Sequence, residues 1–212
     1  MSRILRDRAD HLLTAFQNDP MPPKMALANS GIRSNVARLW GMTWEEDRPG
    51  RSFFLMHPTD PVRSSVWVLP SYGDWIGAYK RFITRTYGIS DPIVPIGFDI
   101  DHLQAKSTVP GSAVIRLEAV PIRANRSHGA GFEARMAESA ITQGRKMRDH
   151  THGSMTWLVA LKLAGVLSPL VGNSAVAEAR HKAAVAYFVG RGWHRTQVEA
   201  GLFALYKVAD RR

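Results

Sequence analysis

The chain contains no cysteine among its 212 residues. Disulfide bridges and zinc sites built on thiolates are therefore excluded, since both need cysteine sulfur. The same absence removes the redox argument for a cellular compartment, so this criterion leaves both the cytosol and export open.

Long hydrophobic runs are also missing. Residues 1–13 scatter charged side chains among apolar ones and lack the continuous hydrophobic region of a secretory signal. The most apolar later stretch, residues 157–171, is interrupted by Lys162 and is shorter than the ~20 residues that span a bilayer. We therefore expect a soluble, cytoplasmic protein without a membrane partner, with delivery through a specialised secretion route left open.

Acidic residues are scarce, because 18 Asp and Glu stand against 28 Lys and Arg and give a formal net charge of +10. Such an excess is typical of proteins that bind an anionic polymer or surface. Apolar residues make up 45% of the chain and charged residues 22%, a composition that favours a folded protein with a sizeable core over a disordered chain.

Apolar periodicity predicts an N-terminal region of helices and short strands. In the first helix Leu5 and Leu12 share one face, and Arg8 belongs to the opposite, exposed face. The third helix is expected to end at Gly88 and to expose a basic face that includes Arg81. The expected helices cover residues 4–17, 32–47 and 71–87, and the expected strands cover residues 52–56 and 65–69.

Residues 98–133 hold two short polar clusters, with Asp101 and His102 in the first and Asn125 and His128 in the second. Hydrolysis of a phosphodiester with one metal ion needs a base for the attacking water and oxygen ligands for the cation. We therefore expect His102 to be the general base and Asp101 and Asn125 to be metal ligands. His128 is a further candidate contact to the metal or to a phosphate, although a histidine at such a place is more often a helix-surface residue.

A strand pattern separates the two clusters. Residues 114–120 alternate, and the alternation predicts that Arg116 and Glu118 point outward while their apolar neighbours point into the core. This strand and residues 100–104 are expected to form a hairpin. Pro121 is suited to begin a helix, which would present the second polar cluster.

The order strand, loop, strand and helix, with Asp101 and His102 on the first element and Asn125 on the helix, resembles the HNH nuclease core. This core is also called ββα-metal or His-Me finger. The likeness covers residues 96–133 and is closest to HNH domains of the kind found in CRISPR effector nucleases. It implies an α+β fold with a ββα-metal core and one divalent metal ion, Mg²⁺ first and Mn²⁺ or another transition metal second. It also implies cleavage of nucleic acid, with DNA favoured, that leaves 5′-phosphate and 3′-hydroxyl ends.

One position departs from the family pattern. The middle Asn of the motif, expected on the second strand near Arg116, is absent, so a backbone carbonyl or Asp99 would have to orient His102. Asp99 is accordingly expected to support the site. The missing Asn favours one alternative, a non-catalytic nucleic-acid-binding protein on the same scaffold. A second alternative is a nuclease toxin with an acidic immunity protein as its partner.

Basic side chains crowd the core and the segment after it, which suits contacts to backbone phosphates. The pair His150 and His152 would suit metal chelation, but a loop that merely holds two histidines is favoured. The tryptophans fall mostly at apolar positions and are expected in the core rather than as stacking platforms for bases. The candidate phosphate contacts are Arg116, Arg123, Arg126, Arg135, Arg145, Lys146 and Arg148.

The C-terminal third is predicted to be helical. We expect three regions within one compact unit, and the oligomeric state is left open. The regions are a helical and short-strand region at 1–95, the nuclease core with a following basic helix at 96–148, and a helical region at 149–212. The expected C-terminal helices cover residues 132–147, 156–167, 174–188 and 196–208.

Overall fold

A computed structural model describes residues 1–28, 30–129, 147, 152–169 and 174–209. The chain forms two compact units. The first comprises Met1–Ala119 and Lys146–Met155, and the second comprises Val120–Arg145 and Thr156–Arg212. The boundary between Ala119 and Val120 falls inside a strand, so that one strand leads from the first unit into the second.

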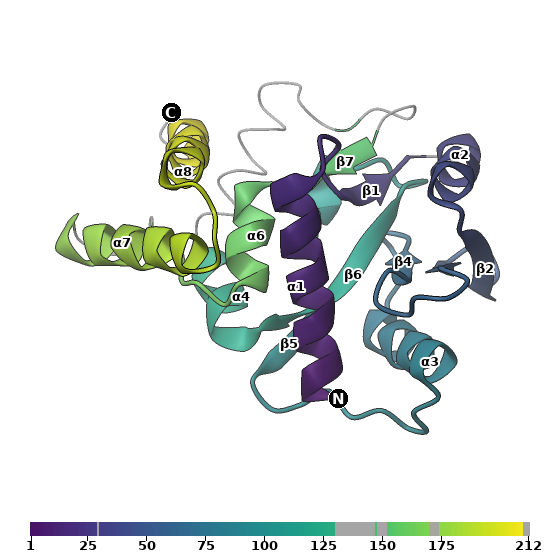
Figure 1. Ribbon diagram of the computed structural model, residues 1–212. Helices are drawn as coiled ribbons and strands as arrows, with labels where there is room; N and C mark the ends of the chain where they lie inside the picture. The colour runs from purple at the N-terminus through teal and green to yellow at the C-terminus, as the bar shows by residue number, and fades with distance from the viewer. Residues whose placement is uncertain (29, 130–146, 148–151, 170–173, 210–212) are drawn as a thin grey trace. The chain divides into compact units, whose positions relative to one another are not determined.

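The first unit is organised around a curled sheet of seven strands (Figure 1). The strand order is β2-β3-β4-β6-β1-β7, each pairing in this order is antiparallel, and β5 pairs with β6 beside this path. The result is a mixed α and β fold, in agreement with the expected α+β class. The strands are β1 Lys24–Leu27, β2 Thr43–Arg48, β3 Ser52–Met56, β4 Ser65–Val68, β5 Phe98–His102, β6 Val114–Pro121 and β7 His152–Ser154.

Apolar side chains cover both faces of this sheet. Along β4, Val66 belongs to one apolar cluster and its neighbour Trp67 belongs to another. Since successive residues of a strand point to opposite faces, the two clusters lie on the two sides of the sheet. Helices α1 (Ser2–Asn18) and α3 (Trp75–Tyr87) pack in the first cluster, and α2 (Ser30–Trp40) packs in the second.

Helix α3 has residues at both ends that satisfy terminal backbone groups. The Asp74 carboxylate accepts a hydrogen bond from the Gly77 N–H at 3.1 Å, as an N-terminal cap does. Gly88 adopts a left-handed φ of 69°, and its N–H donates to the Thr84 carbonyl. The predicted end of the helix at Gly88 is confirmed, and the first helical residue is Trp75.

A cluster of buried charges fastens α1 to β6. Arg8 and Arg116 both donate hydrogen bonds to the Glu118 carboxylate, and the three residues are 1%, 5% and 2% exposed. Tyr79 of α3 donates to the same carboxylate at 3.4 Å. The outward orientation expected for Arg8, Arg116 and Glu118 is therefore wrong. Mutual pairing lets charged groups occupy interior positions that apolar periodicity assigns to solvent.

Strand β2 begins where the helix predicted over 32–47 should continue, and that part of the prediction is wrong. This strand is acidic and pairs with β3 at the edge of the sheet. Asp47 pairs with Arg81 and Glu45 pairs with Arg85, each at 2.8 Å. The exposed face of α3 is therefore less basic than expected, since carboxylates of β2 neutralise two of its cations. The strands predicted over 52–56 and 65–69 are confirmed as the pair β3 and β4, whereas β1 and β7 were not predicted.

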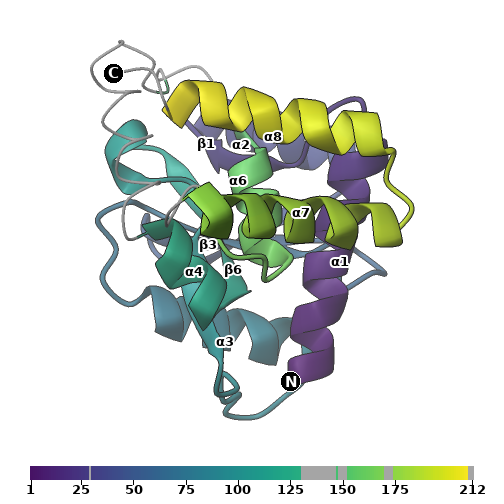
Figure 2. The same ribbon diagram turned by 90° about the vertical axis from the view of Figure 1, so that its left-hand side faces the viewer.

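The second unit is helical in its described part, as expected. Figure 2 shows α7 and α8 one above the other, and a hydrogen bond of 2.8 Å joins His181 of α7 to the Tyr206 hydroxyl of α8. None of the helices in the described residues has the length and apolarity that crossing a membrane requires. The helices are α4 Ile122–His128, α6 Trp157–Leu163, α7 Ser174–Gly190 and α8 Arg195–Ala209.

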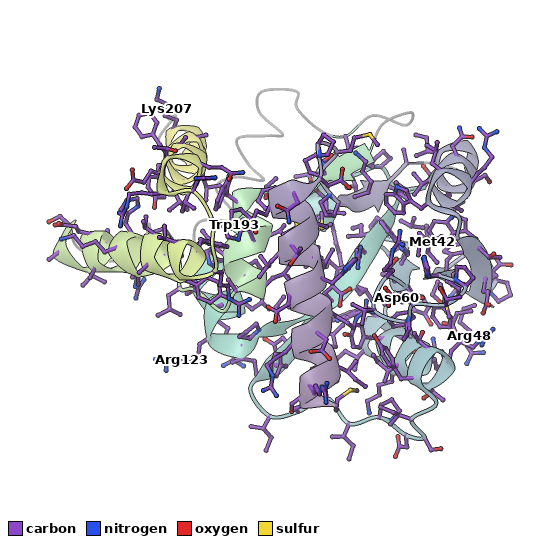
Figure 3. All side chains as sticks on the ribbon, in the orientation of Figure 1. Met42, Arg48, Asp60, Arg123, Trp193 and Lys207 are labelled. Atoms are coloured by element: carbon purple, nitrogen blue, oxygen red, sulfur yellow. The ribbon has the colours of Figure 1, made fainter. Side chains whose placement is uncertain are left out.

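Three aromatic rings form the centre of the second unit. Trp157 of α6, Phe188 of α7 and Trp193 (labelled in Figure 3) have ring centroids 5.0 to 5.4 Å apart. Such spacings are typical of stabilising aromatic pairs. Gly201 lets α8 approach this cluster, because a Cβ atom at that position would overlap the Trp157 indole.

Gly201→Ala is expected to destabilise the second unit by about 1–3 kcal/mol, because the Trp157 ring has to leave its aromatic cluster to admit a methyl group. Thermal unfolding followed by tryptophan fluorescence measures the effect. Gly190→Ala is the matched control, because a Cβ atom there meets no atom within 4 Å. An unfolding midpoint equal in both variants would contradict the close approach of α8 to Trp157.

Glu118→Gln is expected to lower the free energy of unfolding by about 3–5 kcal/mol, because two buried guanidinium groups lose their counter-charge. Burial raises the pKa of Glu118, but the two guanidinium groups outweigh it and hold the pKa below its ordinary 4.5. The stabilisation is thus present at neutral pH and is lost as the pH falls through that lowered pKa. Urea titration at several pH values measures both effects.

The matched control is Glu45→Gln, which removes a half-exposed partner of the exposed Arg85 and should cost less than ~1 kcal/mol. Equal losses at Glu118 and Glu45 would show that the buried cluster contributes no more than a surface pair.

Candidate functional site

Asp101 and His102 are the last two residues of β5. Ile100 and His102 are buried and the intervening Asp101 is half-buried, in the alternation that a strand imposes. The chain stays paired just beyond the strand, because the Leu103 N–H donates to the Arg116 carbonyl at 3.0 Å. The expected pairing of the two strands is confirmed, and it fixes the backbone that carries Asp101 and His102.

The His102 ring packs against Trp75, the first residue of α3. Their ring centroids are 5.5 Å apart and the ring planes meet at 61°, an edge-to-face contact. His102 is 9% exposed, so little of its imidazole is open to water. This contact joins two segments that are far apart in sequence, and no spacing in the sequence indicated it.

A hydrogen-bonded turn follows β5 and leads into the short 3₁₀ helix Lys106–Thr108. The Thr108 N–H and hydroxyl both bond the Ala105 carbonyl, at 3.0 and 2.7 Å, and the Gln104 amide donates to the Thr108 hydroxyl at 2.7 Å. The turn brings the Lys106 ammonium to 4.6 Å from the centre of the Trp75 ring. Trp75 therefore contacts both His102 and Lys106.

Helix α4 begins directly after Pro121, as predicted, and carries Asn125 at a half-buried position. Its last turn is anchored within the second unit. His128 is fully buried with its Nε2 at 2.9 Å from the Val166 carbonyl, and the Ser127 hydroxyl accepts a hydrogen bond of 2.9 Å from the Ser168 N–H. These contacts tie the end of α4 to the chain after α6.

Burial lowers the pKa of His128 to about 4, although the bond to Val166 opposes the shift. The ring is therefore neutral near pH 7, with its proton on Nε2, which donates to the carbonyl. No described residue forms a hydrogen bond with Nδ1. Contact of His128 with a metal or phosphate would have to use this buried atom, so the geometry favours a structural role.

The predicted site residues fall into two groups. Asp99, Asp101 and His102 lie on β5 in the first unit, whereas Asn125 and His128 lie on α4 in the second. The structure brings the members of each group together on one element. In the described residues no group of three or more histidine and acidic side chains is placed to hold a metal.

The candidate phosphate contacts differ in their exposure. The expectation that Arg116 contacts phosphate is wrong, because Arg116 is buried and bound to Glu118. Arg123 (labelled in Figure 3) and Arg126 are exposed on α4. The expected contacts Arg135, Arg145, Lys146 and Arg148, together with His150 of the second histidine pattern, lie outside the described residues.

Two hollows in the first unit lie away from the predicted residues. One of about 410 Å³ is lined by His57, Ser64 and Arg85 among others, and one of about 470 Å³ is lined by Arg51 and Tyr72 among others. Neither of these two hollows is lined by a predicted catalytic residue.

Sequence reasoning missed Trp75 and Lys106 as neighbours of the candidate base. Lys106 follows His102 by four residues across a turn, and this proximity was a usable signal. Trp75 gave none, because its contact depends on how α3 packs against β5. Comparison of the chain with protein-family models, with curated proteins and with solved structures found no match.

The wild-type protein is expected to lose stability as the pH falls, and His128→Gln is expected to abolish this loss. Because folding lowers the His128 pKa to about 4 from its ordinary 6.5, the unfolded chain binds the proton more tightly than the folded protein. Stability is therefore highest above pH 6.5 and falls by roughly 3 kcal/mol as the pH decreases toward 4. Gln keeps a donor for Val166 and does not titrate.

Unfolding midpoints of wild type and variant across this pH range measure the difference. His194→Gln, at an exposed position, should follow the wild type. A parallel pH dependence in wild type and His128→Gln would contradict the buried neutral histidine.

Proposed function

We propose that this protein is a divalent-metal-dependent nuclease of the HNH type, which hydrolyses phosphodiester bonds of nucleic acid, with DNA the favoured substrate. One observation carries the proposal. The paired strands β5 and β6 lead directly into α4, with Asp101 and His102 at the end of the first strand and Asn125 on the helix. This order of elements supports the resemblance of residues 96–133 to the ββα-metal core.

The chemistry of the candidate ligands fits a hard divalent cation. Asp101 offers carboxylate oxygens and Asn125 an amide oxygen, and Mg²⁺ usually takes only one or two protein side chains. Both residues are half-buried, which leaves room for an ion to keep some of its water. When bound, Mg²⁺ would polarise the phosphate and stabilise charge on the leaving oxygen, and Mn²⁺ would suit the same ligands.

His102 is the proposed general base, which takes a proton from the attacking water. A base of this kind needs a fixed ring orientation. The edge-to-face contact with Trp75 restricts ring rotation at His102 and supplies part of the orientation that the family obtains from its middle Asn. The family has its middle Asn on the second strand, near the position of Arg116. In this protein Arg116 donates a hydrogen bond to Glu118.

A second candidate function is nucleic-acid binding without cleavage. The net charge of +10 and the exposed Arg123 and Arg126 favour polyanion binding whether or not the site is catalytic. The missing middle Asn is the specific feature in favour of this alternative.

His102→Ala is expected to lower cleavage by about 10²–10⁴-fold, because a general base contributes a factor of that size. Plasmid and single-stranded substrates incubated in EDTA, Mg²⁺ and Mn²⁺ measure the effect. Asp101→Ala and Asn125→Ala should also reduce activity, and higher metal concentrations should recover part of it.

The matched control is His194→Ala, which removes an exposed histidine and should cleave like the wild type. Metal-dependent cleavage that persists in His102→Ala would overturn the assignment of the base. Salt-sensitive binding without cleavage in any metal would favour the second candidate function.

A further inference from the structure

The side chain of Trp75 has two polar neighbours in the first unit. One is the His102 ring, with centroids 5.5 Å apart, and the other is the Lys106 ammonium, 4.6 Å from the ring centre. The lysine contact lies within the ~6 Å range of cation–π interactions. The Trp75 indole thus contacts both the candidate base His102, at the end of β5, and the cation Lys106, in the turn that follows β5.

The position of Lys106 is fixed by its backbone. The hydrogen bonds among Gln104, Ala105 and Thr108 close the turn on both sides of this lysine. Leu103, which precedes the turn, is 4% exposed and bonded to β6 through its N–H. Lys106 therefore extends from a rigid support, and its flexible part is the side chain alone.

The Lys106 side chain is exposed on the short 3₁₀ helix. No carboxylate in the described part of the chain pairs with its ammonium, whereas Arg81 and Arg85 of α3 pair with carboxylates of β2. A cation–π contact at an exposed site contributes only about 0.5–1 kcal/mol, so the ring orients the ammonium without neutralising it. The N–H groups directed away from Trp75 remain available to an anion.

We infer that Lys106 binds a backbone phosphate of the nucleic acid close to the bond that is cut, and that Trp75 is a positioning residue that holds Lys106 and His102 beside each other. The inference rests on the proposed function for its account of His102. Lysine binds phosphate as a point charge and tolerates varied geometry, which suits contact to any nucleotide sequence.

The distances agree with such a contact. The His102 and Lys106 distances to the same ring, laid end to end, limit the separation of imidazole centre and ammonium to about 10 Å. Charges repeat every ~3.4 Å along one strand of DNA. Groups this close together can contact phosphates of the same short stretch of nucleic acid.

The test is the salt dependence of nucleic-acid binding by Lys106→Met in the full chain. Methionine keeps the contact of an unbranched side chain with Trp75 and removes the charge. Fluorescence anisotropy with labelled single- and double-stranded oligonucleotides, in EDTA and over a series of salt concentrations, gives the slope of log affinity against log salt. The variant should reduce this slope by about 1 and weaken binding equally for unrelated sequences.

The matched control is Lys207→Met. Lys207 (labelled in Figure 3) lies on α8 with its ammonium 4.6 Å from the Phe203 ring, the same cation–π geometry far from His102 in the sequence. The Lys207→Met variant should bind nucleic acid like the wild type. Lys106→Arg should also keep the wild-type slope, since the charge is retained.

A second pair of variants tests Trp75. Trp75→Phe keeps an aromatic face and should retain most binding and cleavage, whereas Trp75→Leu should lower both. Unfolding midpoints identify any variant that merely fails to fold. Equal slopes for wild type, Lys106→Met and Trp75→Leu would overturn the inference.

The outcomes separate this inference from the proposed function. Cleavage that depends on His102 together with an unchanged slope in Lys106→Met would leave the nuclease in place and overturn the phosphate contact. A reduced slope without cleavage in any metal would support the phosphate contact and remove the nuclease. Absence of nucleic-acid binding by the wild type would overturn both.

Discussion

The first unit depends on the buried carboxylate of Glu118. It lies on β6, which has β4 and β1 as neighbours in the strand order, and it binds Arg8 of α1 and Arg116 of β6. Arg8 also donates to the Ser64 carbonyl at 2.9 Å, just before β4. A buried charge that loses its partner costs several kcal/mol, so α1 has one favourable position along the sheet.

This constraint extends to the candidate site. Strand β5 pairs with β6, and the Arg116 carbonyl accepts the hydrogen bond from Leu103 that begins the turn after His102. The same residue thus contributes its side chain to the ion cluster and its backbone to the end of β5. Structural and candidate catalytic roles meet on one strand, although they use different atoms of it.

Much of the fold could be predicted from local patterns. Helices α1, α3, α7 and α8 have strong apolar periodicity or clear ends, and the strands β3 and β4 are short apolar runs between turn residues. β2 could not be predicted, because its acidic sequence carries no strand pattern and its pairing with β3 determines its conformation. Arg8 was misplaced for a related reason, since only a partner distant in sequence, Glu118, makes its burial favourable.

The candidate site could be predicted in part. The sequence indicated that Asp101 and His102 lie on a strand expected over residues 100–104 and that Asn125 follows Pro121 on a helix. Both residues do lie on a strand, but it begins and ends two residues earlier, at Phe98 and His102, and Asn125 lies on α4. The role of Arg116 depends on a carboxylate two residues away that periodicity assigned to solvent. The contact between Trp75 and His102 depends on the packing of α3, which no local pattern encodes.

The acidic edge strand β2 has a consequence for how this edge of the sheet meets other chains. Glu45, Glu46 and Asp47 follow one another on β2, the first strand of the sheet order, within a protein of net charge +10. Charged side chains on an edge hinder the addition of a further strand from another chain. Because Glu45 and Asp47 are paired with Arg85 and Arg81 of α3, charges at this edge largely cancel, and the edge contributes little to the positive field of the first unit.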